Sequence, residues 1–280
     1  MRHSVAGRRV LITGAARGIG AALARRLSER GARVALAGLE PDALAEVAAE
    51  CDAPWRECDV ADRAAVDRAV ADLVGALGGL DVVVANAGVA RQLALVGGDP
   101  AVFEETMRVN TLGTYYTVRA AGSHVSHSRG YALLVSSLAA AVHAPLLGAY
   151  SASKAAVEAL GNTLRAEVAP RGARVGVAYF AELDTDMTSR GFGTRAAAVL
   201  TGGGTVTGVA PLSHAVDALE RGIARRSRWI TSPRWVGPLL PARMFVQPVI
   251  DRHTRSRVAE ALAIARTEDV PYTTERPGRS

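Results

Sequence analysis

Short apolar runs alternate with longer amphipathic segments along most of this 280-residue chain, and this alternation limits its fold more than any other feature. The runs Val10–Thr13 and Val34–Ala37 are too short for helices and have the continuous hydrophobicity of strands buried on both faces. The segments between such runs carry apolar residues at helical spacing. Strands and helices that alternate in this way form one parallel sheet with crossover helices on both faces. The sequence therefore predicts an α/β protein with a doubly wound parallel sheet in a single domain.

The same patterns give the expected bounds of the elements. Seven strands are predicted, at Val10–Thr13, Val34–Ala37, Trp55–Glu57, Asp81–Val84, Tyr131–Val135, Arg174–Tyr179 and Arg228–Thr231. Helices are predicted at Ile19–Arg30, Pro41–Glu50, Ala61–Leu77, Pro100–Ser128, Ala149–Ala169 and Leu212–Arg225, with an irregular or helical segment over Met187–Leu200. Pro41 suits the first turn of its helix, and Gly31 and Gly78 mark helix ends.

Residues 233–280 differ from the rest of the chain. Four prolines stand among large apolar side chains between residues 233 and 250. Because proline disrupts a helix interior, we expect no continuous helix before about Val249, so that this segment wraps around the protein. Its apolar side chains are too many to leave in water. We predict that residues 233–264 close a pocket or contact a second subunit as part of the same domain, and that the end from Thr267 is frayed.

Composition argues against several classes of protein. Apolar residues make up 49% of the chain, as in a globular protein. No stretch of about 18 residues is both apolar and uncharged, so no membrane span is expected; contact of residues 233–250 with a membrane surface is the less favoured alternative. The net charge of +6 comes from arginines spread among acids, which argues against nucleic acid binding. Two cysteines, Cys51 and Cys58, make no disulfide framework, so a cytoplasmic location is the simplest. No metal site is predicted.

The segment Thr13–Gly20 lies between the first predicted strand and the first predicted helix. Glycines 14, 18 and 20 let the backbone turn tightly and approach a diphosphate, while the helix start offers free N–H groups. In this context the pattern predicts a dinucleotide site, which includes Arg17 and Ile19 of the same turn.

Two further segments follow neighbouring strands, where such a site needs them. Asp59-Val60 follows the third strand, and its carboxylate could accept a hydrogen bond from an adenine amino group. Asn86-Ala87-Gly88 follows the fourth strand, where small residues let the chain pass close to the adenine-ribose part of the ligand.

Lys154 is the only lysine among 33 basic residues. An ammonium is a compact charge whose pKa the surroundings can tune, whereas a guanidinium is neither compact nor tunable. Tyr150 stands four residues earlier, on the same face of a predicted helix. A free tyrosine has a pKa of about 10, and acid–base catalysis near neutrality favours about 7. Because a nearby ammonium favours the phenolate, the pair is predicted to transfer a proton.

Together the segment Thr13–Gly20, the triplet Asn86–Gly88 and the run Tyr150–Lys154 resemble the short-chain dehydrogenase/reductase family over roughly residues 7–232. Three motifs in this order at matching strand ends make the resemblance specific. It implies a Rossmann fold in which residues 1–232 form a dinucleotide-binding catalytic domain. It also implies an NAD(P)-dependent alcohol dehydrogenase or ketone reductase that forms a homodimer or homotetramer through its long helices.

The resemblance assigns further roles. Ser137, thirteen residues before the tyrosine, holds the substrate oxygen, with Ser136 as the alternative. Asn110 kinks its helix and holds a water that links the lysine to solvent. Thr185, together with Leu183, binds the nicotinamide carboxamide. In the implied reaction a hydride passes between the nicotinamide and a carbonyl carbon, while the tyrosine transfers the proton.

One departure from the family pattern bears on the substrate. Phe180-Ala181 stands where the family has Pro-Gly, so we expect a reshaped loop in which Phe180 packs on the nicotinamide or narrows the pocket. The loop from Met187 to Val209 is expected to cover the substrate. The predicted pocket residues suggest a mainly apolar secondary alcohol or ketone; they are Ser137, His143, Leu146, Leu147, Tyr179 and Phe180.

The residues after the second strand bear on the choice of cofactor. Gly38 occupies the place where NAD enzymes carry a carboxylate for the ribose hydroxyls, and Arg17 could meet a 2′-phosphate. Leu39 occupies the place where many NADP enzymes have arginine, and Glu40 could accept from the ribose instead. On balance the sequence favours NADP(H), with NAD(H) as the alternative.

Two other functions are less well supported. A non-catalytic nucleotide sensor on this fold would be expected to lack Ser137, Tyr150 or Lys154, and all three are present. An epimerase or dehydratase of the wider superfamily would usually have a longer chain with a larger C-terminal domain.

Overall fold

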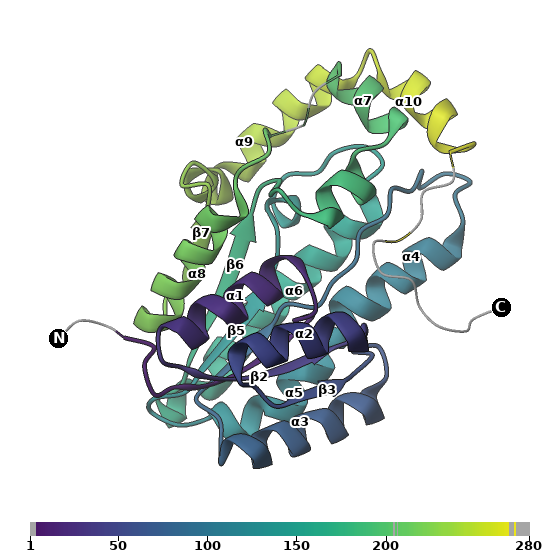
Figure 1. Cartoon of the computed structure of the whole chain (residues 1–280). Coiled ribbons are helices and arrows are strands. Elements are labelled where there is room, and N and C mark those ends of the chain that lie inside the picture. The colour runs from purple at the N-terminus through teal and green to yellow at the C-terminus, as the bar shows by residue number, and fades with distance from the viewer. Residues whose placement is uncertain (1–3, 204, 206, 269–271, 273–280) are drawn as a thin grey trace.

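The computed structural model describes residues 4–203, 205, 207–268 and 272. Within these residues, seven strands form one parallel sheet in the order β3-β2-β1-β4-β5-β6-β7. Helices cover both faces of this sheet (Figure 1). The strand order reverses between β1 and β4, as in a doubly wound sheet. The predicted fold class is therefore confirmed.

Each strand end lies within one residue of its predicted place. The strands are β1 (Arg9–Thr13), β2 (Arg33–Gly38), β3 (Trp55–Glu57), β4 (Val82–Ala85), β5 (Tyr131–Val135), β6 (Arg174–Phe180) and β7 (Trp229–Ser232). The helices that pack on the sheet or beside it are α1 (Gly18–Glu29), α2 (Pro41–Cys51), α3 (Arg63–Leu77), α4 (Pro100–Met107), α5 (Gly113–Val125), α6 (Gly148–Val168) and α8 (Leu212–Arg225). Further along the chain lie the π-helical turn η4 (Met187–Phe192), α7 (Arg195–Thr201), α9 (Val236–Thr254) and α10 (Val258–Ala265).

The core consists of two apolar layers, one on each face of the sheet. Ile12 belongs to the layer under α1, α2 and α8, whereas its neighbour Leu11 belongs to the layer under α3, α5 and α6. Successive side chains of a strand point to opposite faces, so a strand covered on both sides must be apolar throughout. This burial explains the continuous apolar runs from which the strands were predicted.

The helical region predicted over Pro100–Ser128 is divided in the structure. A π-helical turn, η1 (Arg108–Leu112), separates α4 from α5 and contains the buried Asn110. Such turns insert one extra residue into a helix and often occur at functional sites. The interruption changes the direction in which Asn110 faces relative to the helices on either side.

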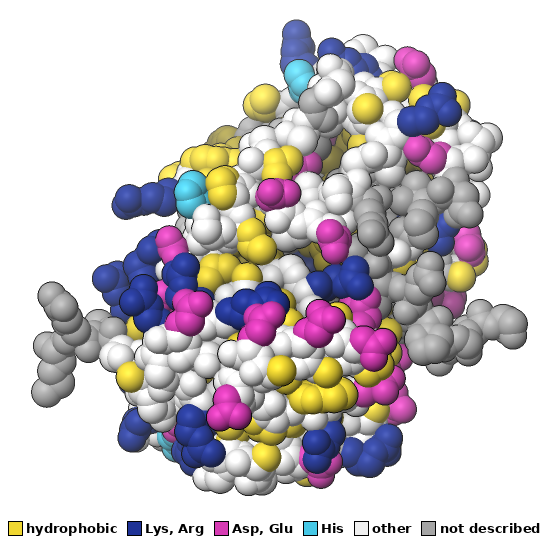
Figure 2. Space-filling model, in the orientation of Figure 1, with side chains coloured by type: hydrophobic (Ala, Val, Ile, Leu, Met, Phe, Trp, Pro, Cys, Tyr) yellow, Lys and Arg dark blue, Asp and Glu magenta, His cyan; other side chains and the backbone are white. Residues whose placement is uncertain are grey.

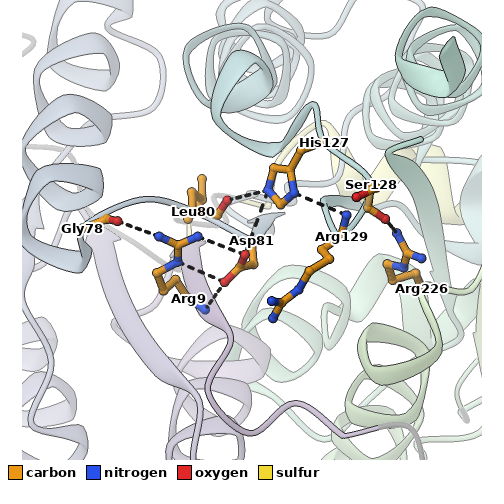
Figure 3. A network of polar contacts seen from close by, with 8 residues as sticks. All are labelled: Arg9, Gly78, Leu80, Asp81, His127, Ser128, Arg129 and Arg226. Carbon is orange, nitrogen blue, oxygen red and sulfur yellow. Dashed lines mark hydrogen bonds and ion pairs between the residues drawn. The ribbon is translucent and has the colours of Figure 1, made fainter. Parts of the chain in front are cut away.

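A polar network ties the elements together at the amino end of the sheet, opposite the site described below (Figure 3). Asp81 accepts hydrogen bonds from the backbone N and Nε of Arg9, both at 3.0 Å, and from its Nη2 at 3.1 Å. The Nη1 of Arg9 donates to the carbonyl of Gly78 at 2.6 Å. Burial alone would raise the pKa of Asp81, but the hydrogen bonds from Arg9 outweigh it and hold that pKa below its ordinary value. The network joins the start of β1 to the start of β4.

The C-terminal segment overturns the expectation of a broken helix. α9 runs without interruption from Val236 to Thr254, with Pro241 and Pro248 inside it. Each proline removes one helical hydrogen bond. Both proline side chains are exposed, so water can reach the backbone on that side of the helix. The helix therefore tolerates both prolines and crosses the surface as one element (Figure 1).

The end predicted to be frayed lies outside the described residues beyond Glu268, apart from Tyr272. The Tyr272 hydroxyl donates to the carbonyl of Val102 at 3.1 Å. Among the described residues, no helix is both long enough and apolar enough to cross a bilayer.

Candidate active site

A cavity of about 430 Å³ lies at the carboxyl ends of the strands, beside the point where the strand order reverses. Its walls come from the segments that follow β1 to β6 and from α6, α7 and a single residue of α9. Ligands of open α/β sheets bind at such a reversal point, and this volume is within the usual range for small-molecule sites.

The glycine turn after β1 is held by backbone contacts. A Cβ on Gly14 would lie 2.6 Å from the Cα of Ala87, and one on Gly20 would lie 2.1 Å from the carbonyl oxygen of Gly14. The side-chain amide of Asn86 donates to the carbonyls of Thr13 (3.0 Å) and Gly14 (3.1 Å). Asn86 therefore fixes the turn against the segment after β4.

The turn leaves room for a ligand on its open side. Gly18 has a φ of +54°, and the nearest atom to a Cβ built there is the Cγ2 of Thr185, 3.9 Å away. α1 begins at Gly18 without a hydrogen bond from a side-chain cap on Arg17. An uncapped helix start beside a glycine cradle fits a diphosphate group, because the first amides of the helix can donate to it.

The structure brings the predicted cofactor residues to this one cavity. Gly20 is the exception, because it is buried behind the wall against Gly14 and Asn86. The others line the cavity: Gly14, Arg17, Gly18, Ile19, Gly38, Leu39, Glu40, Asp59, Val60, Asn86, Ala87, Gly88, Tyr150, Lys154, Leu183 and Thr185.

Arg17 spans the rim of the cavity between two acidic side chains. Its guanidinium pairs with the carboxylate of Glu40 through two nitrogens, with the Nε contact at 2.7 Å. Its Nη1 lies 3.4 Å from Asp186, in the segment after β6. Asp59 accepts a hydrogen bond from the backbone N of Ala61 at 2.9 Å. The sequence predicted neither the pair with Glu40 nor the contact with Asp186.

Three polar side chains, from the turn after β5 and from α6, line the same cavity. Ser137 caps the turn after β5, and its hydroxyl donates to the carbonyl of Phe180 at 3.4 Å. It is also close enough to the Tyr150 hydroxyl to lower the pKa of that tyrosine through a hydrogen bond. The Nζ of Lys154 lies 5.6 Å from the centre of the Tyr150 ring and donates to the carbonyl of Val135 at 3.1 Å. The neighbouring Ser136 is buried and donates to the carbonyl of Lys154 at 2.8 Å. Of the two serines, Ser137 is thus the one that contacts the tyrosine.

Burial controls the acid–base properties of this group. It raises the pKa of Tyr150 to about 12, an effect that the hydrogen bond with Ser137 partly opposes. It lowers the pKa of Lys154 to about 8. At neutral pH the protein by itself therefore holds a protonated tyrosine beside a lysine that is still mostly charged.

Asn110 is buried next to these residues and does not line the cavity. Its Nδ2 donates to the carbonyl of Val89 and to the hydroxyl of Ser153, both at 2.9 Å, and its Oδ1 accepts from the backbone N of Val89 at 2.8 Å. A Cβ on Gly88 would lie 3.1 Å from that Oδ1 and 3.2 Å from the Nζ of Lys154. The π-helical turn thereby brings Asn110 and Lys154 to the same glycine.

The remainder of the cavity is mainly apolar. Leu147 and Phe180 line it as predicted residues, and so does Leu146, whose φ of +69° is unusual for a side chain of this kind. His143 does not line it, contrary to expectation: its side chain is exposed, and its backbone N and O bond to Gln247 of α9. The loop at His143 is therefore attached to α9 and turns that side chain outward.

The loop expected to cover the substrate contributes Met187, Ala197 and Leu200 to the wall. The apolar residues of the wall that were missed from the sequence include Val142 after β5 and Ile250 of α9. Ile250 lies far along the chain, with no local pattern to connect it to the site.

The departure at Phe180-Ala181 has a structural consequence. β6 extends through Phe180, one residue beyond its predicted end, and the backbone N of Ala181 donates to the carbonyl of Ser232 at 3.1 Å. Phe180 is 4% exposed and packs into the layer under α1 and α8. Its side chain thus serves the core as well as the cavity wall.

Comparison with known proteins agrees with this architecture. The profile of the short chain dehydrogenases matches residues 8–195. An uncharacterized oxidoreductase of Mycobacterium tuberculosis is 31% identical over 258 residues, which are 88% of this chain and 100% of that protein. A protein of Arabidopsis thaliana named 11-beta-hydroxysteroid dehydrogenase-like 6 is 30% identical over 258 residues, which are 87% of this chain and 75% of that protein.

Solved structures show the same likeness. A dehydrogenase/reductase from Sinorhizobium meliloti 1021 has a TM-score of 0.73 at 29% identity, covering 82% of this chain and 94% of its own. A short chain dehydrogenase from Mycobacterium paratuberculosis, bound to NAD, has a TM-score of 0.71 at 28% identity, covering 81% of this chain and 97% of its own. Since the profile matches more than half of the chain and the relatives align over most of theirs, this protein belongs to the short-chain dehydrogenase family of oxidoreductases.

Proposed function

We propose that this protein interconverts a mainly apolar secondary alcohol and its ketone with a nicotinamide cofactor, and that Tyr150 is its general acid and base. One observation carries the proposal. Ser137, Tyr150 and Lys154 line the same cavity as a glycine turn suited to a diphosphate. Proton transfer and dinucleotide binding thus share one space.

Each residue has a role that its surroundings support. The cofactor, when bound along the glycine turn, supplies or accepts the hydride. Ser137 and Tyr150 would hold the substrate oxygen, and in reduction Tyr150 gives its phenolic proton to that oxygen. Lys154 stabilises the phenolate that results, because an ammonium nearby favours the charged form. Asn110, which lies beside the same glycine as Lys154, would hold a water that links the lysine to solvent, as the family resemblance implies.

The direction of the pKa shifts predicts how rate depends on pH. A tyrosine whose pKa is raised to about 12 keeps its proton through neutral pH, so reduction needs no change of protonation there. Oxidation needs the phenolate, so its rate should rise as the pH increases. The positive charge of an oxidised nicotinamide would lower the pKa of Tyr150 and move this rise toward neutrality.

An apolar substrate is supported by the lining of the cavity and by one relative. Leu146, Leu147, Phe180, Leu200 and Ile250 all line the cavity that Ser137 also lines. The Arabidopsis protein is named for a hydroxysteroid dehydrogenase, and a steroid alcohol is a large apolar secondary alcohol. Both observations favour such a substrate over a sugar or an amino acid.

The choice between the two cofactors depends on Arg17. The sequence favours NADP(H), because Arg17 is available to a 2′-phosphate and Gly38 lacks a carboxylate. In the folded protein Arg17 is paired with Glu40 and lies near Asp186, so a 2′-phosphate would have to displace a carboxylate. The pair therefore supports NAD(H), the cofactor bound to the paratuberculosis relative. Dissociation constants of NADH and NADPH test this: Glu40→Gln should tighten NADPH more than NADH, and tighter NADPH binding by the unaltered protein would restore the preference drawn from the sequence.

The homodimer or homotetramer and the cytoplasmic location stay predictions. Exposed apolar side chains on or next to α5, Leu112 at 40% and Tyr115 at 44% exposure, support pairing through this helix.

The activity is tested with a panel of apolar secondary alcohols and ketones, followed by the absorbance of NADH and NADPH. Tyr150→Phe should lower kcat by roughly 10²–10⁴-fold and leave cofactor binding nearly unchanged. Lys154→Arg should also lose most activity, since a guanidinium is bulkier and its pKa is fixed. The control is Tyr115→Phe, which removes the same hydroxyl from an exposed position on α5. No turnover across the panel, or full activity of Tyr150→Phe, contradicts the proposal.

A further inference from the structure

The outward side of α9 is an uninterrupted apolar surface. It consists of Pro238, Pro241, Met244, Phe245, Pro248 and Val249, here called the α9 face. The spacing of three or four residues puts them on one side of the helix. Met244 is 79%, Phe245 81% and Val249 64% exposed. In Figure 2, hydrophobic side chains are visible on the upper left side of the molecule, where Figure 1 places α9.

This exposure does not result from a loosely attached helix. On the other side of α9, Val236 is fully buried, and Ile250 lines the cavity. Gln247 bonds to both backbone groups of His143, at 2.8 and 2.9 Å. Arg243 pairs with Glu158 of α6 at 3.3 Å. The inner contacts fix the rotation of the helix about its axis, so the apolar face is held in water by the fold.

The charges around the α9 face are mainly positive. Arg234 stands before the helix, and Arg252 and Arg255 stand at its C-terminal end; all three are exposed. The acid nearest in sequence is Asp251 at the edge of the face, which accepts a hydrogen bond from Gln247 at 2.8 Å. The face itself contains no charged residue. An apolar strip with arginines at both ends is typical of helices that lie in a membrane interface.

A second copy of the chain fits this face poorly. In a twofold contact the same patch meets itself. If the two α9 helices ran antiparallel, Arg234 would approach Arg252 or Arg255 of the other copy; if they ran parallel, each arginine would approach its own equivalent. Either arrangement brings like charges together at both ends of an apolar contact. An anionic surface neutralises the same arginines.

The prolines limit how deeply the helix can enter a lipid phase. Pro241 and Pro248 cannot donate to the carbonyls of Gly237 and Met244, which lie four residues earlier. Carbonyls without that donor are costly in hydrocarbon but can be hydrated among lipid headgroups. The helix is therefore suited to the boundary between headgroups and acyl chains.

We propose that the α9 face docks this protein on the surface of an anionic phospholipid bilayer. This differs from the expectation drawn from composition, because the sequence did not show that these six side chains share one exposed face. Since Ile250 of the same helix lines the cavity, docking would bring an apolar substrate dissolved in the bilayer close to the site. That consequence depends on the proposed function, whereas the docking itself does not.

The test is flotation of the full-length protein with two kinds of vesicle, in the absence of cofactor and substrate. One kind is pure phosphatidylcholine, and the other is equal parts of phosphatidylcholine and phosphatidylglycerol. The unaltered protein should float with the anionic vesicles and much less with the neutral ones. The double variant Met244→Ser, Phe245→Ser should lose at least about tenfold in vesicle affinity, because two large side chains no longer enter the lipid. Arg252→Gln and Arg255→Gln should each cost about fivefold on anionic vesicles.

The matched control is Val96→Ser, which removes an apolar side chain that is 81% exposed in the loop before α4; it should bind vesicles as the unaltered protein does. All variants should keep the melting temperature and vesicle-free activity, since none touches the core or the cavity. If the serine variant has a lower melting temperature, the vesicle binding of the arginine variants tests the proposal instead, because they remove no apolar side chain.

Three results would overturn the proposal. The first is unaltered protein that stays in solution with anionic vesicles. The second is a double serine variant that floats as well as the unaltered protein. The third is an oligomer in solution that the serine variant dissociates, which would identify a second copy as the partner of this face. Because vesicle binding is measured without turnover, its failure and the failure of the proposed enzymatic activity are distinguishable.

Discussion

The carboxyl edge of the sheet and the cap formed by α7, α9 and α10 adjoin the same cavity, which α7 and α9 line, but they are held by different kinds of contact. At the sheet edge, backbones touch: a Cβ on Gly14 or Gly20 would overlap with neighbouring main-chain atoms. In the cap, side chains make the contacts, through a small apolar cluster around Leu200 and Ala261 and through polar pairs such as Thr194 with Gln92 at 2.7 Å.

This difference indicates which part of the site can vary. Backbone contacts permit only glycine at given positions, so the groups for dinucleotide binding and proton transfer sit in a frame with little freedom. Side-chain contacts can be replaced by others of similar volume. Substrate preference and surface properties are therefore expected to depend on the cap, and the chemistry on the sheet edge.

The largest effect on folding is expected at the sheet edge. Gly20→Ala would place a Cβ 2.1 Å from the carbonyl oxygen of Gly14 and 2.7 Å from the side-chain nitrogen of Asn86. Because a backbone atom cannot move aside, the free energy of unfolding should fall by about 3 kcal/mol or more. The control is Gly75→Ala in α3, where no atom lies within 4 Å of the new Cβ; it should gain up to about 1 kcal/mol. Urea unfolding measures both, and equal stability of the two variants would contradict the comparison.

A smaller effect is expected at the amino edge, from Asp81→Asn. Loss of the charged hydrogen bonds with Arg9 should cost about 2 kcal/mol at neutral pH. Since the pKa of Asp81 is held below its ordinary value, its charge stabilises the fold above the unfolded pKa of about 4, and this contribution is lost as the pH falls through the folded pKa. The difference between the two proteins should therefore shrink in acid.

The matched control for Asp81 is Asp67→Asn. Asp67 pairs with Arg119 where the two side chains are 43% and 39% exposed, so its loss should cost less than about 1 kcal/mol. Urea unfolding at neutral and acidic pH measures all three proteins. If Asp67→Asn lowered the free energy of unfolding as much as Asp81→Asn does, burial of the Arg9–Asp81 ion pair would add nothing to stability at the amino edge.

The smallest effect is expected in the cap, where Ile250→Ala should change substrate binding rather than stability. Removing part of the cavity wall should raise the KM of the best substrate found in the panel by about tenfold, the lower end of what one methylene contact contributes in an apolar pocket, with little change in kcat. The control is Val249→Ala, which shortens the neighbouring side chain on the outward face of α9 and should leave KM unchanged. A fall in kcat similar to that of Tyr150→Phe would show that the cap also orders the chemistry.

The local spacing of residues was sufficient to predict much of the fold and of the site. A strand buried on both faces must be apolar throughout, so the adjacent apolar residues Leu11 and Ile12 are enough to predict β1. Tyr150 and Lys154 are four residues apart on one helix, and that spacing alone puts them on the same side. The glycines of the first turn could be placed for the same reason, because they lie between a strand and a helix that each have a clear local pattern.

Contacts between distant segments were decided only by the tertiary structure. Ser137 and Ser136 are adjacent in the chain, and only packing against α6 shows that the first contacts Tyr150 and the second the backbone of Lys154. The pairing of Arg17 with Glu40 depends on how the turn after β1 lies beside the end of β2. The sequence by itself determined the sheet and the motifs at its edge, because these follow from periods of two and of three to four residues. Contacts between residues far apart in the sequence decided the rest, and no local period in the sequence shows such contacts. They determined the course of α9 through its prolines, the exposed face of that helix and the place of Ile250 in the cavity wall.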